Sequence, residues 1–161
     1  DFAFNSDRHV EPDAQGRIWI TDLGMNELWG LHVERGDIEK HRMPLVPGES
    51  HFHSLLYGAA IDARNNRVWW AQLYGYAGSF DTERKIAERV LPFERGDGPR
   101  RLAIQDDGTL WVPLFGSSQI VRIDGETGLE TGRFQIPDPG AAPYGITFDK
   151  KRNALWAATS N

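Results

Sequence analysis

The sequence predicts an all-β fold, a segment of a β-propeller with about three and a half four-stranded blades. Two observations carry this prediction. One phrase occurs four times: a short strand, an acidic or glycine-containing turn, and a second strand with a tryptophan. The tryptophans recur every 42 to 50 residues, at Trp19, Trp69, Trp111 and Trp156. That period is typical of a propeller blade, and no ten-residue stretch has the i, i+3, i+4 apolar spacing of a helical repeat.

Each period contains the other elements of a blade. After the tryptophan strand of the third period, we expect a strand at 119–123, a turn with Asp124-Gly125, and a strand at 130–136. Glycine and the Asp-Gly pair supply the positive φ that tight hairpins need. The equivalent outer strands are expected at 28–33, 38–44, 78–81 and 86–92.

The four phrases set the expected blades, at about 9–45, 57–93, 101–136 and 144–161. The fourth contains only its first two strands, and residues 1–5 fit the outermost strand of a preceding blade. These pieces do not complete a closed ring of four. We therefore expect the chain to belong to a ring of six or seven blades and to have the remainder of that ring as a partner.

The repeated tryptophans are expected in the core between blades. Each ring buries about 150–250 Å², which stabilises the fold by about 1.5–3 kcal/mol. Trp29 and Trp70 lie outside the repeated position and are expected to be freer to serve another role.

Composition argues against two classes of partner. The net charge is −5, with acidic and basic residues interspersed, so no basic patch is expected to neutralise phosphates. No apolar run approaches the roughly 18–20 residues of a membrane helix. We therefore expect neither nucleic acid nor a membrane as a partner, and the absence of cysteine excludes disulfides and thiolate chemistry.

Residues at one mouth of the propeller channel form the candidate site for a small-molecule ligand. The inner strand of each blade begins, and the second strand ends, on the same face of the ring. Residues just before the inner strands and three positions after the repeated tryptophans should therefore converge there, as polar groups do in ligand sites. The candidate substrate-binding residues are Arg8, Tyr57, Gln72, Arg100, Arg101 and Tyr144.

His9 and Asp22 are the candidate catalytic pair at this mouth. A carboxylate orients a neighbouring histidine and raises its basicity, which prepares it as a general base or metal ligand. The alternative is a rim histidine in an ordinary hydrogen bond. The guanidinium groups of Arg100 and Arg101 could hold a carboxylate or polarise a carbonyl, the alternative being a solvated or ion-paired rim.

His51 and His53 are the candidate metal ligands, in the loop that lengthens the first period. In an extended chain, side chains at i and i+2 point the same way, so both imidazoles could reach one metal ion.

Three phrases resemble the repeats of the streptogramin B lyase (virginiamycin B lyase) family: 108–111 (Gly-Thr-Leu-Trp), 142–147 (Ala-Pro-Tyr-Gly-Ile-Thr) and 19–22 (Trp-Ile-Thr-Asp). The resemblance covers nearly the whole chain. It implies a seven-bladed ring, a divalent cation such as Mg²⁺, and opening of a cyclic depsipeptide at its ester by elimination without water. It also implies that His9 occupies the position of the family's catalytic histidine. Asp22 occupies the position of the paired glutamate, with a side chain that is one methylene shorter.

Residues 143–146 (Pro-Tyr-Gly-Ile) are also similar to the regucalcin and gluconolactonase type, whose six-bladed enzymes hold a divalent cation through glutamate, asparagine and aspartate. Tyr144 stands where that asparagine is expected.

The sequence supports two hypotheses about function. One is a lyase-like propeller acting on or binding a small cyclic or ester-containing molecule, with His9 as general base. The other is a non-catalytic propeller that binds a ligand or protein through Tyr57, Trp70, Arg100 and Tyr144.

Overall fold

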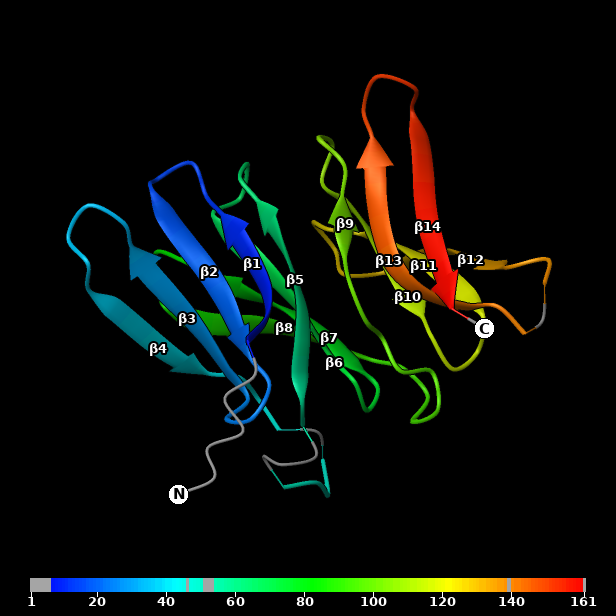
Figure 1. Cartoon of the computed structure of the whole chain (residues 1–161), viewed down its shortest axis with the longest axis horizontal. Helices are drawn as coiled ribbons and strands as arrows, with labels where there is room; N and C mark the ends of the chain where they lie inside the picture. The colour runs from blue at the N-terminus through cyan, green and yellow to red at the C-terminus, as the bar shows by residue number, and fades with distance from the viewer. Residues whose placement is uncertain (1–6, 46, 51–53, 139, 161) are drawn as a thin grey trace.

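The computed structural model describes residues 7–45, 47–50, 54–138 and 140–160, which form an all-β structure (Figure 1). Fourteen strands in this part of the chain make three four-stranded antiparallel sheets and one two-stranded sheet. The described residues contain no helix, and hence none that is long and apolar enough to cross a membrane. The predicted all-β propeller segment is confirmed.

The sheets follow one another along the chain, each a meander of neighbouring strands. The first contains β1 (Asp7–Pro12), β2 (Arg17–Asp22), β3 (Glu27–His32) and β4 (Ile38–Arg42). The second contains β5 (Leu56–Asp62), β6 (Arg67–Gln72), β7 (Tyr76–Asp81) and β8 (Ile86–Pro92). The third contains β9 (Ala103–Ile104), β10 (Thr109–Leu114), β11 (Gln119–Asp124) and β12 (Glu130–Gln135). The last is the hairpin of β13 (Ala142–Asp149) and β14 (Ala154–Ser160).

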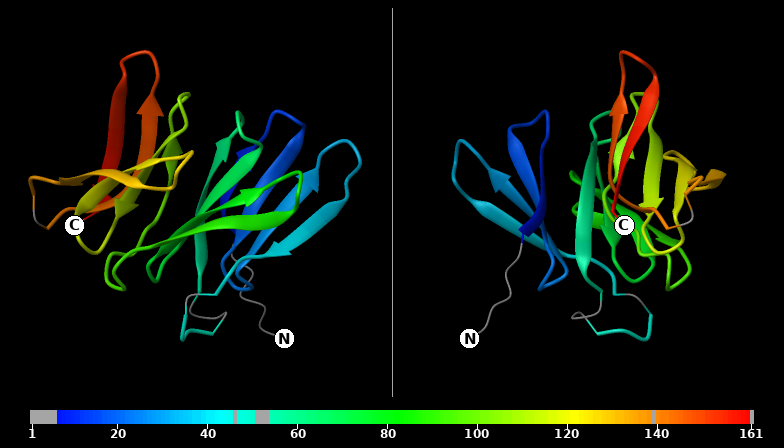
Figure 2. Two further views of the ribbon diagram at one scale, coloured as in Figure 1. Left: turned by 180° about the vertical axis from the view of Figure 1, so that it is seen from behind. Right: turned by 45° about the vertical axis from the view of Figure 1, so that its right-hand side comes forward.

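The first strand of each sheet lies on the inner side of the arrangement. β1 packs beside β5, β5 beside β9, and β9 beside β13. Figure 2 shows the sheets standing side by side as twisted blades, with the outer strands turned away from this inner row. The four inner strands line one side of a channel, and the ends of the strands form its mouths.

The turn before each tryptophan strand needs a residue with positive φ, which explains why its residue types recur. The residue before that strand has positive φ in every described copy, 74° at Gly16, 50° at Asn66, 90° at Gly108 and 50° at Asn153. Glycine and asparagine tolerate this region best. The strand therefore begins at the same place in each blade.

The polar residue of the repeated phrase holds the indole in two of the blades. Trp19 Nε1 donates to Asp13 Oδ2 at 2.8 Å, and Trp111 Nε1 donates to Gln105 Oε1 at 2.8 Å. The buried carboxylate of Asp13 also accepts from Arg17 Nε at 2.7 Å. Burial raises the pKa of Asp13, but these hydrogen bonds outweigh burial and hold the pKa below its ordinary value.

The core lies in the interfaces between successive blades. Trp19 and Trp69 are fully buried, and Trp111 is partly buried. The expectation that Trp70 is free was wrong, because its ring is also fully buried and packs between the first two blades. Trp70 directly follows the repeated tryptophan, so its side chain lies on the opposite face of β6. The first blade covers that face.

Trp156 corrects the expectation that all four repeated tryptophans are core. It is 59% exposed. In the part of the chain that the structure describes, the hairpin of β13 and β14 is the last sheet, so no later blade covers the Trp156 face. Trp29 is half-buried, its indole donates to Glu27 Oε2 at 2.9 Å, and Lys40 Nζ lies 4.1 Å from its ring centroid.

Candidate functional site at the channel mouth

A repeated β-bulge presents side chains at the start of the inner strands. The pairing of β5 with β6 skips Tyr57, that of β13 with β14 skips Tyr144, and that of β1 with β2 skips Arg8. Arg100 precedes β9 at the equivalent place in the third blade. Because these positions stand at the start of four neighbouring inner strands, they lie at one mouth of the channel, and bulges of this kind often border a functional site.

Aromatic and cationic side chains meet at this mouth. The Tyr57 hydroxyl hydrogen-bonds the Tyr144 hydroxyl, and their rings meet edge to face with centroids 5.9 Å apart. Arg100 Cζ lies 5.3 Å from the centroid of the Tyr57 ring and 4.4 Å from that of Phe115. Arg101 Cζ lies 5.7 Å from the Tyr57 centroid. We call Tyr57, Arg100, Arg101, Phe115 and Tyr144, together with His9 and Glu11, the mouth cluster.

His9 joins this cluster through both ring nitrogens. Arg101 Nη1 hydrogen-bonds His9 Nδ1, and because arginine only donates, Nδ1 is the acceptor. The other nitrogen, Nε2, carries the proton and donates to Glu11 Oε1 at 2.7 Å. The imidazole is therefore held between a guanidinium and a carboxylate. Its side chain is only 14% exposed.

Asp22 does not lie where the sequence analysis expected the carboxylate partner of His9. Its Oδ1 accepts the backbone N–H groups of Gly24 at 2.9 Å and Met25 at 3.3 Å, so the carboxylate closes the turn after β2. His9 pairs with Thr21 across the ladder and shares its face, whereas Asp22 points to the other face. The carboxylate that hydrogen-bonds His9 is Glu11.

Gln72 lies at the end of β6, as predicted, but its side chain is 1% exposed. Its amide donates to Asn26 Oδ1 at 2.8 Å and to the Pro44 carbonyl at 2.7 Å, which joins the first two blades. Residues before the inner strands thus gather at the mouth, while Asp22 and Gln72, three positions after the tryptophans, are buried between the blades. The backbone of Arg8 lies in β1, its side chain is outside the description, and His51 and His53 lie outside the described residues.

Two residues of the mouth cluster were missed by the sequence prediction. Glu11 follows His9 by two positions in one strand, and this spacing places both side chains on one face. Phe115 follows the last residue of β10, directly after the position where that strand reaches the mouth. Both residues could therefore have been found from their positions in the sequence.

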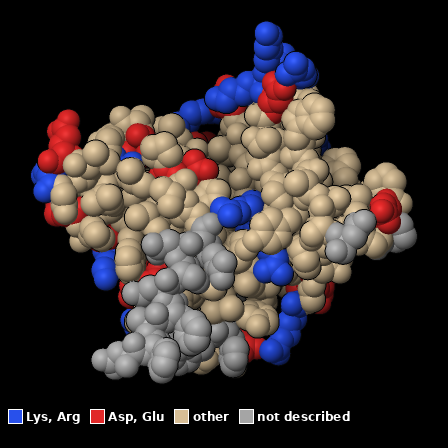
Figure 3. Space-filling model, in the orientation of Figure 1, with Lys and Arg blue, Asp and Glu red and all other residues tan. Residues whose placement is uncertain are grey.

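A hollow of about 290 Å³ lies along the inner strands, and His9 and Glu11 of the mouth cluster line it together with residues of the other three blades. In Figure 3, basic side chains lie near the middle of the face with largely uncharged atoms around them. Burial lowers the pKa of Arg100, while the neighbouring Tyr57 and Tyr74 act to raise it.

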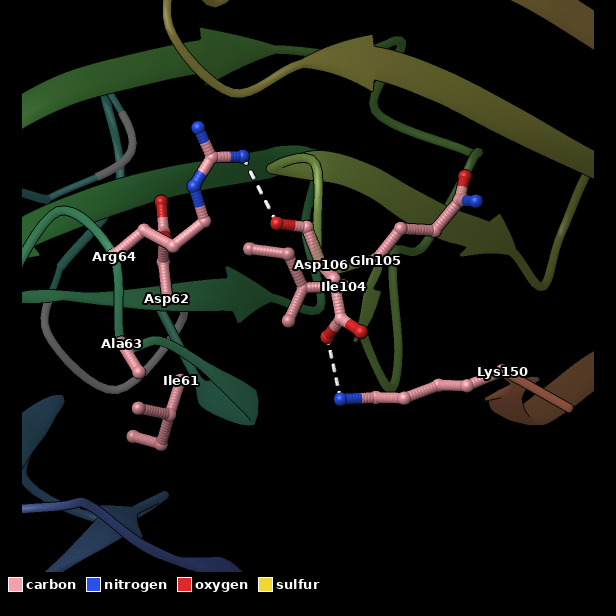
Figure 4. Close-up of a pocket in the computed structure, with 8 residues that line it drawn as sticks. All are labelled: Ile61, Asp62, Ala63, Arg64, Ile104, Gln105, Asp106 and Lys150. Atoms are coloured by element: carbon pink, nitrogen blue, oxygen red, sulfur yellow. Dashed lines mark hydrogen bonds and ion pairs between the residues drawn. The ribbon is translucent and has the colours of Figure 1, made fainter.

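A second hollow, of about 370 Å³, lies at the other ends of β5 and β9 (Figure 4). Arg64 Nη1 donates to the backbone carbonyl of Asp106 at 2.9 Å, and Lys150 Nζ forms an ion pair with the Asp106 carboxylate. Both cations of this hollow therefore have a hydrogen-bond acceptor within the protein.

The mouth cluster does not fit a magnesium ion. Mg²⁺ prefers carboxylate and water oxygens in octahedral geometry, whereas the described mouth has one carboxylate, on Glu11, beside two guanidinium groups. Among the described residues there is no group of three or more histidine, aspartate or glutamate side chains that could hold a metal ion.

The fold and the mouth cluster define the class of this chain as a β-propeller segment with a polar and aromatic cluster at the channel mouth. No protein-family profile matches the chain. Among curated proteins it is 25% identical to an uncharacterised protein of Sulfolobus acidocaldarius, over 92% of the chain and 55% of that protein.

Among solved structures, the chain is similar to virginiamycin B lyase from Staphylococcus aureus. The TM-score is 0.82 with 24% identity, over 97% of the chain and 50% of the lyase. A structure described as streptogramin B lyase matches with TM-score 0.78 and 23% identity, over 97% and 49%. Hydrazine synthase of Kuenenia stuttgartiensis matches with TM-score 0.82 at 13% identity, over 98% and 43%. These likenesses show the propeller fold, and the chain spans about half the length of the relatives.

Proposed function

We propose that this chain is part of a lyase-like β-propeller that acts on a small cyclic or ester-containing molecule at the mouth cluster. One observation supports it above the others. The His9 imidazole is held between Glu11 and Arg101 beside the aromatic rings, and a carboxylate at one ring nitrogen is the arrangement that prepares a histidine as a general base.

The chemistry follows from the hydrogen bonds of His9. Once Arg101 turns from Nδ1 toward the ligand, Nδ1 takes a proton from the carbon next to the one that bears the ester oxygen. The electrons of that C–H bond form a C=C bond, the C–O bond breaks, and the ester leaves as a carboxylate. The proton stays on Nδ1, and Glu11 stabilises the resulting imidazolium through Nε2. No water enters the product.

The substrate class is supported by the fold neighbours. A catalytically inactive variant of the Staphylococcus aureus virginiamycin B lyase has been solved with quinupristin, and it aligns with this chain at TM-score 0.82 and 23% identity. Quinupristin is therefore the first molecule to test. A divalent cation remains a proposal that would rest on His51 and His53, and no step is assigned to it.

The test is to incubate the full-length chain with quinupristin and follow ring opening by chromatography and mass spectrometry. Elimination opens the ring without changing the mass, whereas hydrolysis adds one water. We expect His9→Ala to abolish ring opening, and His32→Ala, on β3 of the same blade, to leave it unchanged. Ring opening that survives in His9→Ala, or a product heavier by one water, would refute the proposal.

The alternative is a propeller that binds its ligand without converting it. It is favoured by the fact that both nitrogens of His9 are already hydrogen-bonded. Quinupristin would then bind with unchanged covalent structure, and His9→Ala would alter affinity only.

A further inference from the structure

Arg100 makes no hydrogen bond or ion pair through its guanidinium within the described residues. Its contacts are the ring faces of Tyr57 and Phe115, and its Nε is buried without a hydrogen-bond partner. Ring faces attract a cation but accept no conventional hydrogen bond. The planar fork of N–H donors therefore lacks an acceptor from this part of the protein, although burial of an uncompensated charge is unfavourable.

The backbone fixes Arg100 in this place. A Cβ atom at Gly58 would lie 2.2 Å from the Arg100 carbonyl oxygen, so the second and third blades touch here backbone to backbone. The Arg100 N–H donates to the Pro113 carbonyl at 3.3 Å. The guanidinium thus projects from a rigid part of the scaffold, and little conformational freedom is lost when a ligand binds it.

A second guanidinium adds to the positive charge. Arg101 is adjacent in sequence and also lies against Tyr57, and among the described residues its side chain hydrogen-bonds the His9 imidazole. In the second hollow, by contrast, Arg64 and Lys150 are both bonded to Asp106. Among the described residues, neither Arg100 nor Arg101 forms an ion pair, so two guanidinium groups lie side by side at the mouth without a carboxylate partner.

We propose that Arg100, assisted by Arg101, binds a carboxylate on an aromatic ligand at this mouth. A guanidinium pairs with a planar carboxylate through two parallel N–H···O bonds. Phe115 and Tyr144 offer ring surface to the rest of the ligand, while the buried Tyr57 packs against the two guanidinium groups. The proposal rests on the proposed function for the location of the site but not for the reaction. If elimination occurs there, the carboxylate it releases meets the same guanidinium.

The test is binding of benzoate to the full-length chain, measured by calorimetry, with neutral benzamide and inorganic phosphate as comparison ligands. We expect benzoate to bind more tightly than both. Arg100→Gln should weaken benzoate binding by about tenfold or more, Arg100→Lys should weaken it less, and the matched Arg64→Gln should leave it unchanged. Arg100→Lys keeps the positive charge at the site, and its benzoate affinity provides the test if Arg100→Gln does not fold.

Equal binding of benzamide, tighter binding of phosphate, or unchanged benzoate affinity in Arg100→Gln and Arg100→Lys would each overturn the assignment. Failure of the proposed function gives a different result. Benzoate would then bind through Arg100 while quinupristin is not opened. Conversely, opened quinupristin with no benzoate binding removes this inference alone.

Discussion

Arg101 in the third blade donates a hydrogen bond to Nδ1 of His9 in the first blade, across 92 positions of sequence. The other ring nitrogen, Nε2, lies 2.7 Å from Glu11 Oε1. The contact with Arg101 means that a ligand able to attract Arg101 would release the basic nitrogen of His9. The first and third blades therefore act together at the mouth.

The carboxylate that supports His9 can be identified by comparing two variants. Glu11→Gln should lower turnover of quinupristin by about 10- to 100-fold, the usual cost of removing a carboxylate that supports a functional histidine. Asp22→Asn should have little effect on turnover, because an amide oxygen can still accept the N–H groups of Gly24 and Met25. Steady-state kinetics at several quinupristin concentrations measures both. A larger loss of turnover in Asp22→Asn than in Glu11→Gln would instead support Asp22 as the carboxylate partner of His9.

The interfaces between blades can be tested with two tryptophans at the same repeat position. Trp19→Ala should lower the free energy of unfolding by about 3–5 kcal/mol, because it opens a large cavity and removes the bond to Asp13. In the 161-residue chain alone, Trp156→Ala should change it by no more than about 0.5 kcal/mol, as for an exposed residue, whereas in a ring whose next blade covers Trp156 the loss should approach that of Trp19→Ala. Urea denaturation gives both values. Equal losses would show that the Trp156 face is covered in the intact protein.

His41 should make stability depend on pH. Its ring packs 4.6 Å from Phe80 and 6.2 Å from Trp19, centroid to centroid. Burial lowers its pKa, which Glu39 acts to raise and Lys85 to lower further. Because the unfolded chain binds the proton more readily, stability should be complete above the unfolded pKa of about 6.5 and decrease as the pH falls toward the folded pKa.

The measurement is the melting temperature between neutral and mildly acidic pH, with His41→Phe as the control. Phenylalanine keeps the ring contacts and cannot be protonated, so the decrease just below the histidine pKa should be smaller in this variant. Carboxylates with lowered pKa, such as Asp13 and Glu39, remove stability only at more acidic pH. An identical pH profile in His41→Phe would assign the effect to other groups.

The repeat predicted the strands because the tryptophan phrase is local: a positive-φ residue followed by a strand in which alternate side chains are buried. The mouth cluster could be predicted in part. Tyr57, Arg100, Arg101 and Tyr144 were found from their position before each inner strand. The bulges at these positions depend on strand register, which no repeat of residue types encodes. The contact of His9 with Arg101 depends on the curvature of the blades.

The central claim is that the ligand binds at His9 and the surrounding mouth cluster. It is tested most directly by histidine side-chain NMR spectra of the full-length chain with and without quinupristin, with the His9 signals assigned from His9→Ala. We predict that the Nδ1 and Nε2 signals of His9 shift on binding, while those of His32 and His41 in the outer strands do not. Unchanged His9 signals in the presence of bound quinupristin would contradict this claim.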